Sequence, residues 1–304
     1  MSRGVRWSPL GAVALLCCRP AGDPSPAPAS TEAGPYRPFL ERKAAHLTTL
    51  REDGPSPGRY DEGFVPEGAT VVRYRSGEHE LLAWLFLPAT AEAGPVPGLL
   101  YCHGSFSLGP KDAEALRPLV DAGLAVLAPA LRGENGNPGR IELLYGEVDD
   151  AIAAAQWLAA RPEVDAEHLY AVGHSIGGGV VAMLALHPEA PVRLTASVGG
   201  IYVPQTFQRW SRSEANAGLV RFDPFDPAEG TLRTLGPNLR DLAHPHHAYI
   251  GDEDTWFHPN AAAVEADARR FGVPFTLERV PGDHMSCLAP ALERFVARIE
   301  ADLE

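Results

Sequence analysis

One serine lies in a local sequence that suits a catalytic nucleophile. Residues 172–179 read Val-Gly-His-Ser-Ile-Gly-Gly-Gly, which places Ser175 at the centre of a Gly-x-Ser-x-Gly pattern. Residues 169–172 before it have strand character, and residues 177–186 are small and apolar, which indicates a helix. On a sharp strand-to-helix turn, a serine is strained and glycines let strand and helix approach closely. The same residues also fit an ordinary glycine-rich turn, so the pattern needs partners elsewhere in the chain.

A serine hydroxyl becomes a good nucleophile only when a histidine removes its proton and a carboxylate orients that histidine. The stretch Ile-Gly-Asp-Glu-Asp ends an apolar run and offers Asp252 or Asp254 as the carboxylate. The stretch Pro-Gly-Asp-His follows a run of strand character and offers His284 as the base. The order serine, acid, histidine is that of α/β-hydrolase sheets, in which such loops follow strands. We therefore expect His284 to activate Ser175.

Early in the chain, a second loop could stabilise the negative charge that such chemistry creates on a carbonyl oxygen. A buried strand is expected over residues 97–101, and it leads into Cys-His-Gly-Ser-Phe. In these sheets the donors are the backbone N–H after the nucleophile, here Ile176, and one from this loop, here Ser105. Each donor lowers the barrier by about 3 kcal/mol. We expect the imidazole of His103 to stabilise the turn rather than to react.

Length, composition and charge limit the classes of protein to which the chain can belong. Its 304 residues are 45% hydrophobic, which suffices for one large α/β core. The formal net charge of −13 argues against nucleic acid and anionic membrane surfaces as partners. No run of 18 apolar residues occurs, so we expect no membrane-spanning helix.

The first 35 residues differ in composition from the rest. Residues 1–18 contain two arginines followed by an apolar run, which is typical of an export signal, and residues 19–35 form a Pro-rich linker expected to be disordered. The pair Cys17-Cys18 resembles the site of lipid attachment in a bacterial lipoprotein signal, with Cys18 the better fit. We expect an exported, periplasmic or cell-envelope lipoprotein. The alternative is a cytoplasmic enzyme with a disordered tail.

Several other side chains are expected to be structural. Arg132 and Glu134 lie in a loop rich in turn formers, and we expect them to fix that loop rather than to contact substrate. Cys102 and Cys287 are expected to be separate buried thiols without a disulfide. Residues 244–247, His-Pro-His-His, lack a carboxylate at a known spacing, so no metal is expected there.

Hydrophobic periodicity predicts the elements around these groups. Residues 202–244 lack clean periodicity but carry Phe207, Trp210, Phe222 and Phe225, so they form either a lid over the site or a plug that packs on the body. Residues 70–74 and 81–87 are expected to pair antiparallel at the edge of the sheet. Further strands are expected over residues 123–129 and 194–198, and helices over residues 39–51, 147–160, 260–271 and 288–303.

Together these motifs resemble the catalytic domain of the prolyl oligopeptidase group of α/β hydrolases, with dienelactone hydrolases as close relatives. The resemblance covers residues 70–300. It implies an α/β-hydrolase fold in a domain of residues 36–304: a mostly parallel twisted sheet, helices on both faces and a lid-like insertion at 202–244. The matching segments are Tyr-Cys-His-Gly at 101–104, Pro-Ala-Leu-Arg-Gly-Glu-Asn-Gly at 129–136, Glu-Val-Asp-Asp at 147–150, Val-Asp at 164–165, Gly-His-Ser-Ile-Gly-Gly at 173–178, Gly-Asp-Glu-Asp at 251–254 and Gly-Asp-His at 282–284.

The resemblance also implies a site and a substrate. In the family the acid is the third residue after the glycine that ends its strand, which favours Asp254 over Asp252. Such an enzyme needs no cofactor and acts on a small ester or a short peptide. A peptidase of prolyl oligopeptidase type is thus the first expectation.

Two departures keep other functions open. Ser105 stands where relatives often carry a second glycine, and the 304 residues include no β-propeller ahead of the domain. That propeller helps prolyl oligopeptidases to select short peptides, so a carboxylesterase is the alternative. A non-catalytic binding protein with the same fold is a third, less favoured hypothesis.

Overall fold

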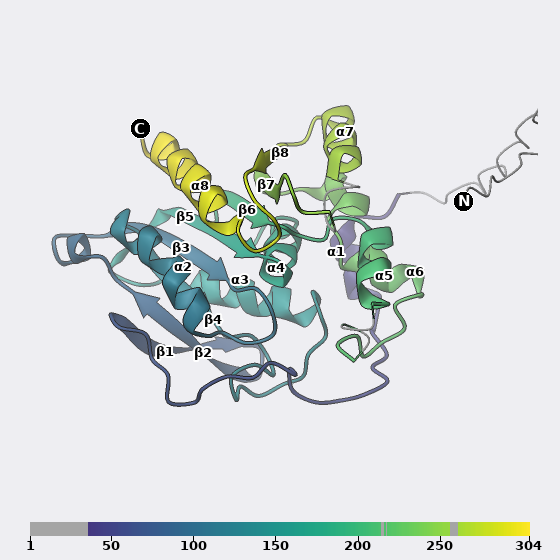
Figure 1. The fold of residues 1–304 in the computed structure, drawn as a ribbon, viewed down its shortest axis with the longest axis horizontal. Helices are drawn as coiled ribbons and strands as arrows, with labels where there is room; N and C mark the ends of the chain where they lie inside the picture. The colour runs from purple at the N-terminus through teal and green to yellow at the C-terminus, as the bar shows by residue number, and fades with distance from the viewer. Residues whose placement is uncertain (1–35, 214–215, 217, 256–260) are drawn as a thin grey trace, which may run out of the picture. The chain divides into compact units, whose positions relative to one another are not determined.

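The computed structural model describes residues 36–213, 216, 218–255 and 261–304. The expected signal and linker, residues 1–18 and 19–35, lie outside the described residues. One compact unit comprises Arg37–Glu304 (Figure 1).

An eight-stranded sheet forms the centre of this unit among the described residues, in the order β1-β2-β4-β3-β5-β6-β7-β8. The neighbours β1–β2 and β2–β4 pair antiparallel, and every other neighbouring pair is parallel. The expected antiparallel pair at the sheet edge is therefore confirmed. The strands are β1 Ala69–Ser76, β2 His79–Phe86, β3 Val96–Cys102, β4 Ala125–Pro129, β5 Val164–His174, β6 Leu194–Val198, β7 His246–Gly251 and β8 Phe275–Val280.

Helices cover both faces of the sheet, so each face has its own apolar core. Along β3, Leu100 and Cys102 point into one core, and Leu99 and Tyr101 into the other, as the two-residue period of a strand requires. The central parallel strands β3, β4, β6 and β7 are buried at nearly every position because helices cover both faces of the sheet. The helices that contribute side chains to the first core are α3 Gly146–Ala159, α4 Ile176–Leu184 and α7 Ala261–Phe271. Those that contribute to the second core are α2 Pro110–Asp121 and α8 Leu288–Leu303.

The first helix is shorter than its periodicity predicted. Instead of running over residues 39–51, α1 Phe39–Ala44 ends at Ala44. His46 and Thr48 then bond to the buried carboxylate of Glu229, at 2.9 and 3.1 Å. These tertiary bonds draw the chain out of helical geometry, and the prediction of a longer helix was wrong.

Helix α2 was not anticipated from the sequence. It begins at Pro110, where the missing N–H costs nothing, and Asp112 Oδ2 accepts the Gly109 N–H at 2.9 Å. Leu116 and Leu119 are fully buried against the sheet. An internal proline usually breaks a helix, yet this helix continues through Pro118 to Asp121.

The described residues of the insertion at 202–244 fold into three short helices. They are α5 Pro204–Ser211, α6 Pro227–Leu232 and the 3-10 helix η2 Gly236–Asp241; a further 3-10 turn, η1, spans Ala89–Glu92. Phe207 and Phe222 are buried and stack on one another, so both aromatics anchor the insertion in the body, as the plug hypothesis stated.

Arg233 is the strongest polar anchor of the insertion. Its guanidinium is fully buried, pairs with Glu229 and lies 4.0 Å from the centre of the Phe222 ring. It also donates to the carbonyl of Leu143 at 2.8 Å and to Thr48 Oγ1 at 2.9 Å. A buried charge with this many partners holds the insertion in one position on the body.

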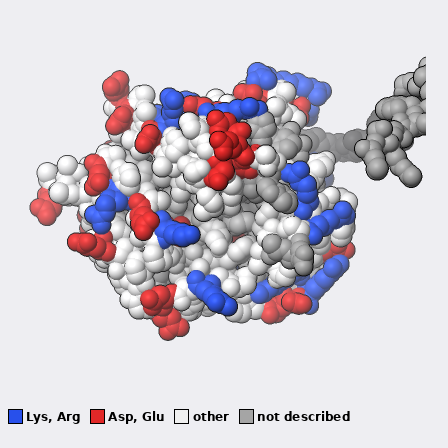
Figure 2. Space-filling model, viewed as in Figure 1, with Lys and Arg blue, Asp and Glu red and all other residues white. Residues whose placement is uncertain are grey.

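Charged side chains of both signs are interspersed over the face shown in Figure 2. Within the described part of the chain, no helix is both long and apolar enough to cross a membrane.

Candidate active site

The nucleophile candidate sits where β5 turns into α4. Ser175 has φ 54° and ψ −115°, a strained conformation for a residue with a side chain. A Cβ on Gly173 would lie 2.1 Å from the Gly177 carbonyl oxygen, and one on Gly177 would lie 2.1 Å from that of Cys102. Glycine is therefore required at both positions. The strained turn is held by the Ser175 N–H, which donates to the Val198 carbonyl at 2.8 Å.

Three side chains from three loops form a hydrogen-bonded chain. His284 Nε2 lies 2.9 Å from Ser175 Oγ, and His284 Nδ1 lies 2.8 Å from Asp254 Oδ2. A carboxylate can only accept, so Nδ1 carries the proton and the lone pair of Nε2 faces the serine hydroxyl. The Asp254 side chain is buried, whereas 26% of the His284 side chain is exposed. This is the arrangement that general-base activation of a serine requires.

Asp252, the alternative acid, has a different partner. Its Oδ1 accepts the N–H of Gly282 at 3.0 Å and so braces the loop that carries His284. The structure thus joins Asp254, and not Asp252, to the histidine by a hydrogen bond.

His174, which precedes the serine, fixes the backbone of the base. Its Nε2 lies 2.8 Å from the carbonyl oxygen of His284, and because a carbonyl only accepts, this nitrogen is the donor. Burial lowers the pKa of His174, which keeps the ring neutral. Hence His174 is a positioning residue.

The two candidate oxyanion donors line the same pocket as the serine. Ile176 is the first residue of α4. The backbone N–H groups in the first turn of a helix have no partner within the helix, and they lie at the positive end of its dipole, which suits them to a negatively charged oxygen. Ser105 has φ 67°, in the left-handed region. A Cβ on Gly104 would lie 2.9 Å from His174 Nδ1, so the loop passes too close to His174 for a side chain there.

The buried ion pair of His103 and Glu134 stabilises the loop that contains Gly104 and Ser105. His103 Nε2 lies 2.9 Å from Glu134 Oε2, and His103 Nδ1 lies 2.9 Å from the Gly104 carbonyl oxygen. Burial lowers the pKa of His103, but the charge of Glu134 and its hydrogen bond outweigh that effect and raise the pKa to about 9. Both ring nitrogens therefore donate, and the imidazolium holds the segment that leads into Ser105. Glu134 also accepts the Leu131 N–H at 2.8 Å, which confirms its expected role in fixing its loop.

The pocket around Ser175 has a volume of about 680 Å³. The insertion contributes Trp210 and Asn216 to its wall, so part of the insertion faces the site as the lid hypothesis stated. Helix α2 contributes Lys111 and Asp112, which sequence reasoning missed because it did not anticipate this helix. The signal that could have found it is Gly-Pro followed by Leu116 and Leu119 at helical spacing.

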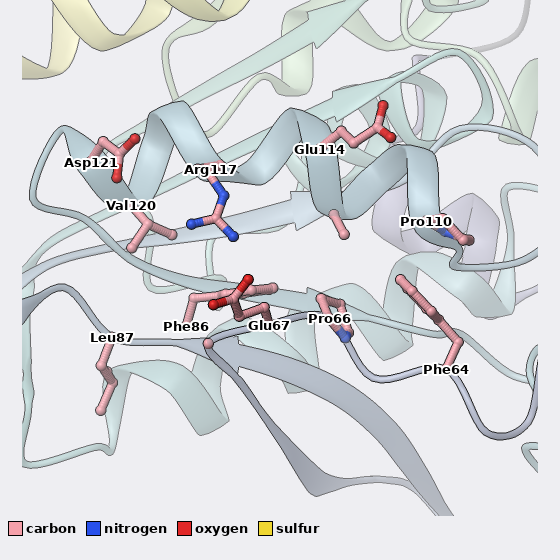
Figure 3. A pocket seen from close by; sticks show the side chains of 12 residues that line it. Phe64, Pro66, Glu67, Phe86, Leu87, Pro110, Glu114, Arg117, Val120 and Asp121 are labelled. Atoms are coloured by element: carbon pink, nitrogen blue, oxygen red, sulfur yellow. The ribbon is translucent and has the colours of Figure 1, made fainter.

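A second hollow lies on the other side of α2 and is shown in Figure 3. It has a volume of about 350 Å³, and none of Ser175, Asp254 and His284 lines it. In the figure, Glu114 and Arg117 extend from α2 on one side, and Phe64, Pro66 and Glu67 lie on the other.

Among the described residues, Arg132, Cys102 and Cys287 have structural roles. The guanidinium of Arg132 donates two hydrogen bonds to Asp150, at 2.8 and 2.9 Å, and its backbone N–H donates a third at 2.9 Å, so the pair fixes the loop. Cys102 and Cys287 are free and buried, as expected.

The histidines of residues 244–247 bind other protein groups. His246 is buried between Thr195 Oγ1 and Ser197 Oγ, His244 bonds to the carbonyl of His187, and His247 bonds to Thr276 Oγ1. No cluster of three metal-binding side chains occurs among the described residues.

Comparison with known families places the chain. The family model for X-Pro dipeptidyl-peptidase (S15 family) matches residues 13–269, which is more than half of the chain. The chain belongs to the S15 peptidase family. An uncharacterized protein of Mycobacterium tuberculosis H37Rv is 34% identical to this chain over 173 residues, which make up 55% of this chain and 60% of that protein. The uncharacterized peptidase YtmA of Bacillus subtilis is 28% identical over 120 residues, 38% of this chain and 45% of that one.

Solved structures resemble this S15 family member in fold. Acylaminoacyl peptidase of Pyrococcus horikoshii has a TM-score of 0.61 at 16% identity, over 76% of this chain and 41% of that one. A puromycin-hydrolyzing peptidase of Mycobacterium tuberculosis has a TM-score of 0.63 at 19% identity, over 76% and 38%. The esterase Pf2001 of Pyrococcus furiosus has a TM-score of 0.62 at 19% identity, over 84% and 97%. The expected α/β-hydrolase fold is confirmed.

Proposed function

We propose that this protein is a serine hydrolase that cleaves an amide or ester bond through an acyl-enzyme. The observation that carries the proposal is the chain of hydrogen bonds from Ser175 through His284 to buried Asp254. Ser175 Oγ forms a bond to the substrate carbonyl carbon while its proton passes to His284 Nε2. The bond to the leaving group then breaks, and His284 returns the proton to the departing oxygen or nitrogen.

A water molecule completes the cycle by the reverse sequence. His284 takes a proton from water, the hydroxide bonds to the acyl carbon, and the Ser175–acyl bond breaks with the proton returning to Oγ. In both halves the carbonyl oxygen becomes negative, and the N–H groups of Ile176 and Ser105 are the donors proposed to stabilise it. Asp254 stabilises the imidazolium that forms transiently on His284.

Peptides cleaved after Xaa-Pro are the first candidate substrates, and membership of the S15 family supports them. The finer description, a peptidase of prolyl oligopeptidase type, rests on the sequence motifs. The chain spans about 60% of the length of the first curated relatives it matches, so their substrates are not carried over. A carboxylesterase is the second candidate, supported by the match along 97% of the Pyrococcus furiosus esterase.

Paired kinetics on the purified protein test the proposal. An Xaa-Pro p-nitroanilide and a short-chain p-nitrophenyl ester are each assayed with wild type and Ser175→Ala. We expect hydrolysis of the anilide by wild type and its loss in the variant. Ester turnover alone, lost in Ser175→Ala, would make the protein an esterase. If wild type and variant were equally inactive and a fluorophosphonate failed to label Ser175, the binding-protein hypothesis would replace the enzyme.

We further propose export and lipid attachment at Cys17 or Cys18, supported by the sequence of residues 1–18 alone. Intact mass of the protein from the membrane fraction should show a lipid adduct that Cys18→Ser or Cys17→Ser removes. Recovery of an unmodified chain from the cytoplasm would refute this localisation.

A further inference from the structure

Helices α2 and α8 pack on the same face of the sheet (Figure 1). A largely apolar groove is lined by residues of both helices. It has a volume of about 530 Å³. Its charged groups, Lys111, Glu114 and Glu293, belong to exposed residues. The apolar residues that line it are Ala115, Pro118, Leu119, Met285, Leu288, Ala289, Leu292 and Val296.

The groove is continuous with the pocket of the proposed nucleophile. Lys111, Met285 and Leu288 line both of them. Met285 directly follows His284, and 60% of its surface is exposed. A substrate group that leaves the pocket past His284 therefore enters the groove over Met285 and Leu288.

Proton transfer decides which part of the substrate takes that path. His284 Nε2 must come within hydrogen-bond distance of the atom that departs from the carbonyl carbon. The acyl substituent and the oxyanion occupy the other two positions around that carbon, and the proposed oxyanion donors lie at Ser105 and Ile176. The leaving group is thus the part of the substrate nearest to His284 and Met285.

We propose that the α2–α8 groove binds an extended apolar chain on the leaving group, so that the preferred substrates release a long-chain alcohol or amine. This inference rests on the proposed serine hydrolase function. In the reaction, the bond from the carbonyl carbon to the oxygen or nitrogen of that chain breaks, and the departing atom takes its proton from His284. The apolar groove then holds the product until it dissociates.

The hollow of Figure 3 does not suit this role. Glu67, Glu114, Arg117 and Asp121 are among the residues that line it. Of its lining residues, Pro110 alone also lines the pocket of Ser175, whereas the α2–α8 groove shares three residues with that pocket. Because exposed charged residues line both the hollow and the α2–α8 groove, the residues shared with the pocket decide between them, and the α2–α8 groove is favoured.

The test varies the leaving group and keeps the acyl group constant. Ethyl, butyl, hexyl and octyl esters of acetic acid and of alanyl-proline are compared by kcat/KM. Each methylene that moves from water into an apolar site raises kcat/KM by up to about fourfold. We expect a rise along the series that levels off when the chain fills the groove.

Two tryptophan variants of α8 separate the groove from the rest of the helix. Ala289 is exposed and lines the groove, so Ala289→Trp should fill it and flatten the rise with chain length. Ala297 is exposed on the same helix and does not line the groove, so Ala297→Trp should keep both the rise and the ethyl ester activity.

Each outcome of these assays decides the matter. A flat chain-length series in an active, Ser175-dependent wild type, or an unchanged rise in Ala289→Trp, would overturn the inference and leave the hydrolase proposal standing. Absence of Ser175-dependent turnover for every ester, together with no phosphonate labelling, would overturn both. A rise that Ala289→Trp removes and Ala297→Trp keeps would establish the groove as the leaving-group site.

Discussion

The buried pair of His103 and Glu134 makes a prediction about stability that can be worked out from its geometry. The folded protein raises the pKa of His103 to about 9, against about 6.5 for an unfolded histidine. The folded state therefore binds the proton more tightly, and the pair stabilises it fully below pH 6.5. The pH dependence of linkage gives about 3 kcal/mol at pH 6, about 2 kcal/mol at pH 7.5 and less than about 1 kcal/mol at pH 9.

Urea denaturation of wild type and His103→Gln, followed by tryptophan fluorescence between pH 6 and pH 9, measures this contribution. The difference between their free energies of unfolding should shrink by about 3 kcal/mol across that range. Any constant part of the difference reflects packing and is not part of the prediction. A difference that stays constant with pH would refute the claim that the folded protein holds an imidazolium at this position.

Replacing Glu134, the partner of His103, should reverse the direction in which this contribution to stability changes with pH. In Glu134→Gln the strongest raising influence on the pKa of His103 is gone, while the charge of Asp112 and the hydrogen bond to Gly104 remain. We expect burial, the largest single influence on His103, then to lower its pKa below the ordinary value. Relative to His103→Gln, this variant should gain stability as the pH rises through 6.5, where wild type loses it. If Glu134→Gln followed the same slope as wild type, another group would have to supply the charge.

Three further predictions concern single side chains. Asp254→Asn should lower kcat by roughly 10³–10⁴-fold because it unsettles the histidine tautomer, whereas Asp252→Asn, which can still accept its backbone N–H, should keep most of the activity in the same assay. Gly177→Ala should lower Tm, with a loss of about 1–3 kcal/mol or failure to fold, while Gly94→Ala, whose Cβ would meet nothing within 4 Å, should leave Tm nearly unchanged. Arg233→Met should cost about 3–5 kcal/mol in urea denaturation because it leaves a buried carboxylate without its guanidinium, and a loss under 1 kcal/mol would contradict the anchoring role.

Most of the sheet could be predicted from the sequence because parallel strands covered on both faces are continuous apolar runs. The strand over residues 194–198 has the predicted bounds. Helix α2 was missed because Gly109-Pro110 resembles a turn and Pro118 resembles a break, and only packing of Leu116 and Leu119 on the sheet reveals the element. Local signals fail where tertiary contacts outweigh them.

In the proposed site, too, some features could be predicted from local sequence and others depend on tertiary contacts. Ser175 and His284 were identified from short motifs whose spacing carries their chemistry. Asp254 was favoured over Asp252 by its spacing from Gly251 in the family that the chain resembles, and the hydrogen bond of Asp254 to His284 agrees with that choice. The hydrogen bond from His174 to the carbonyl of His284 joins positions 110 residues apart, so it could be found only in three dimensions.

That long separation has a consequence for biosynthesis. Ser175 and His284 lie 109 residues apart, and β6, β7 and β8 are made between them. A nascent or truncated chain that lacks the later strands carries the serine without its base, and a serine hydroxyl without a base is a poor nucleophile. Hydrolytic activity thus emerges only after the later half of the sheet has been synthesised and docked. Enzymatic turnover during refolding would report the completion of the sheet, whereas tryptophan fluorescence also responds to earlier collapse.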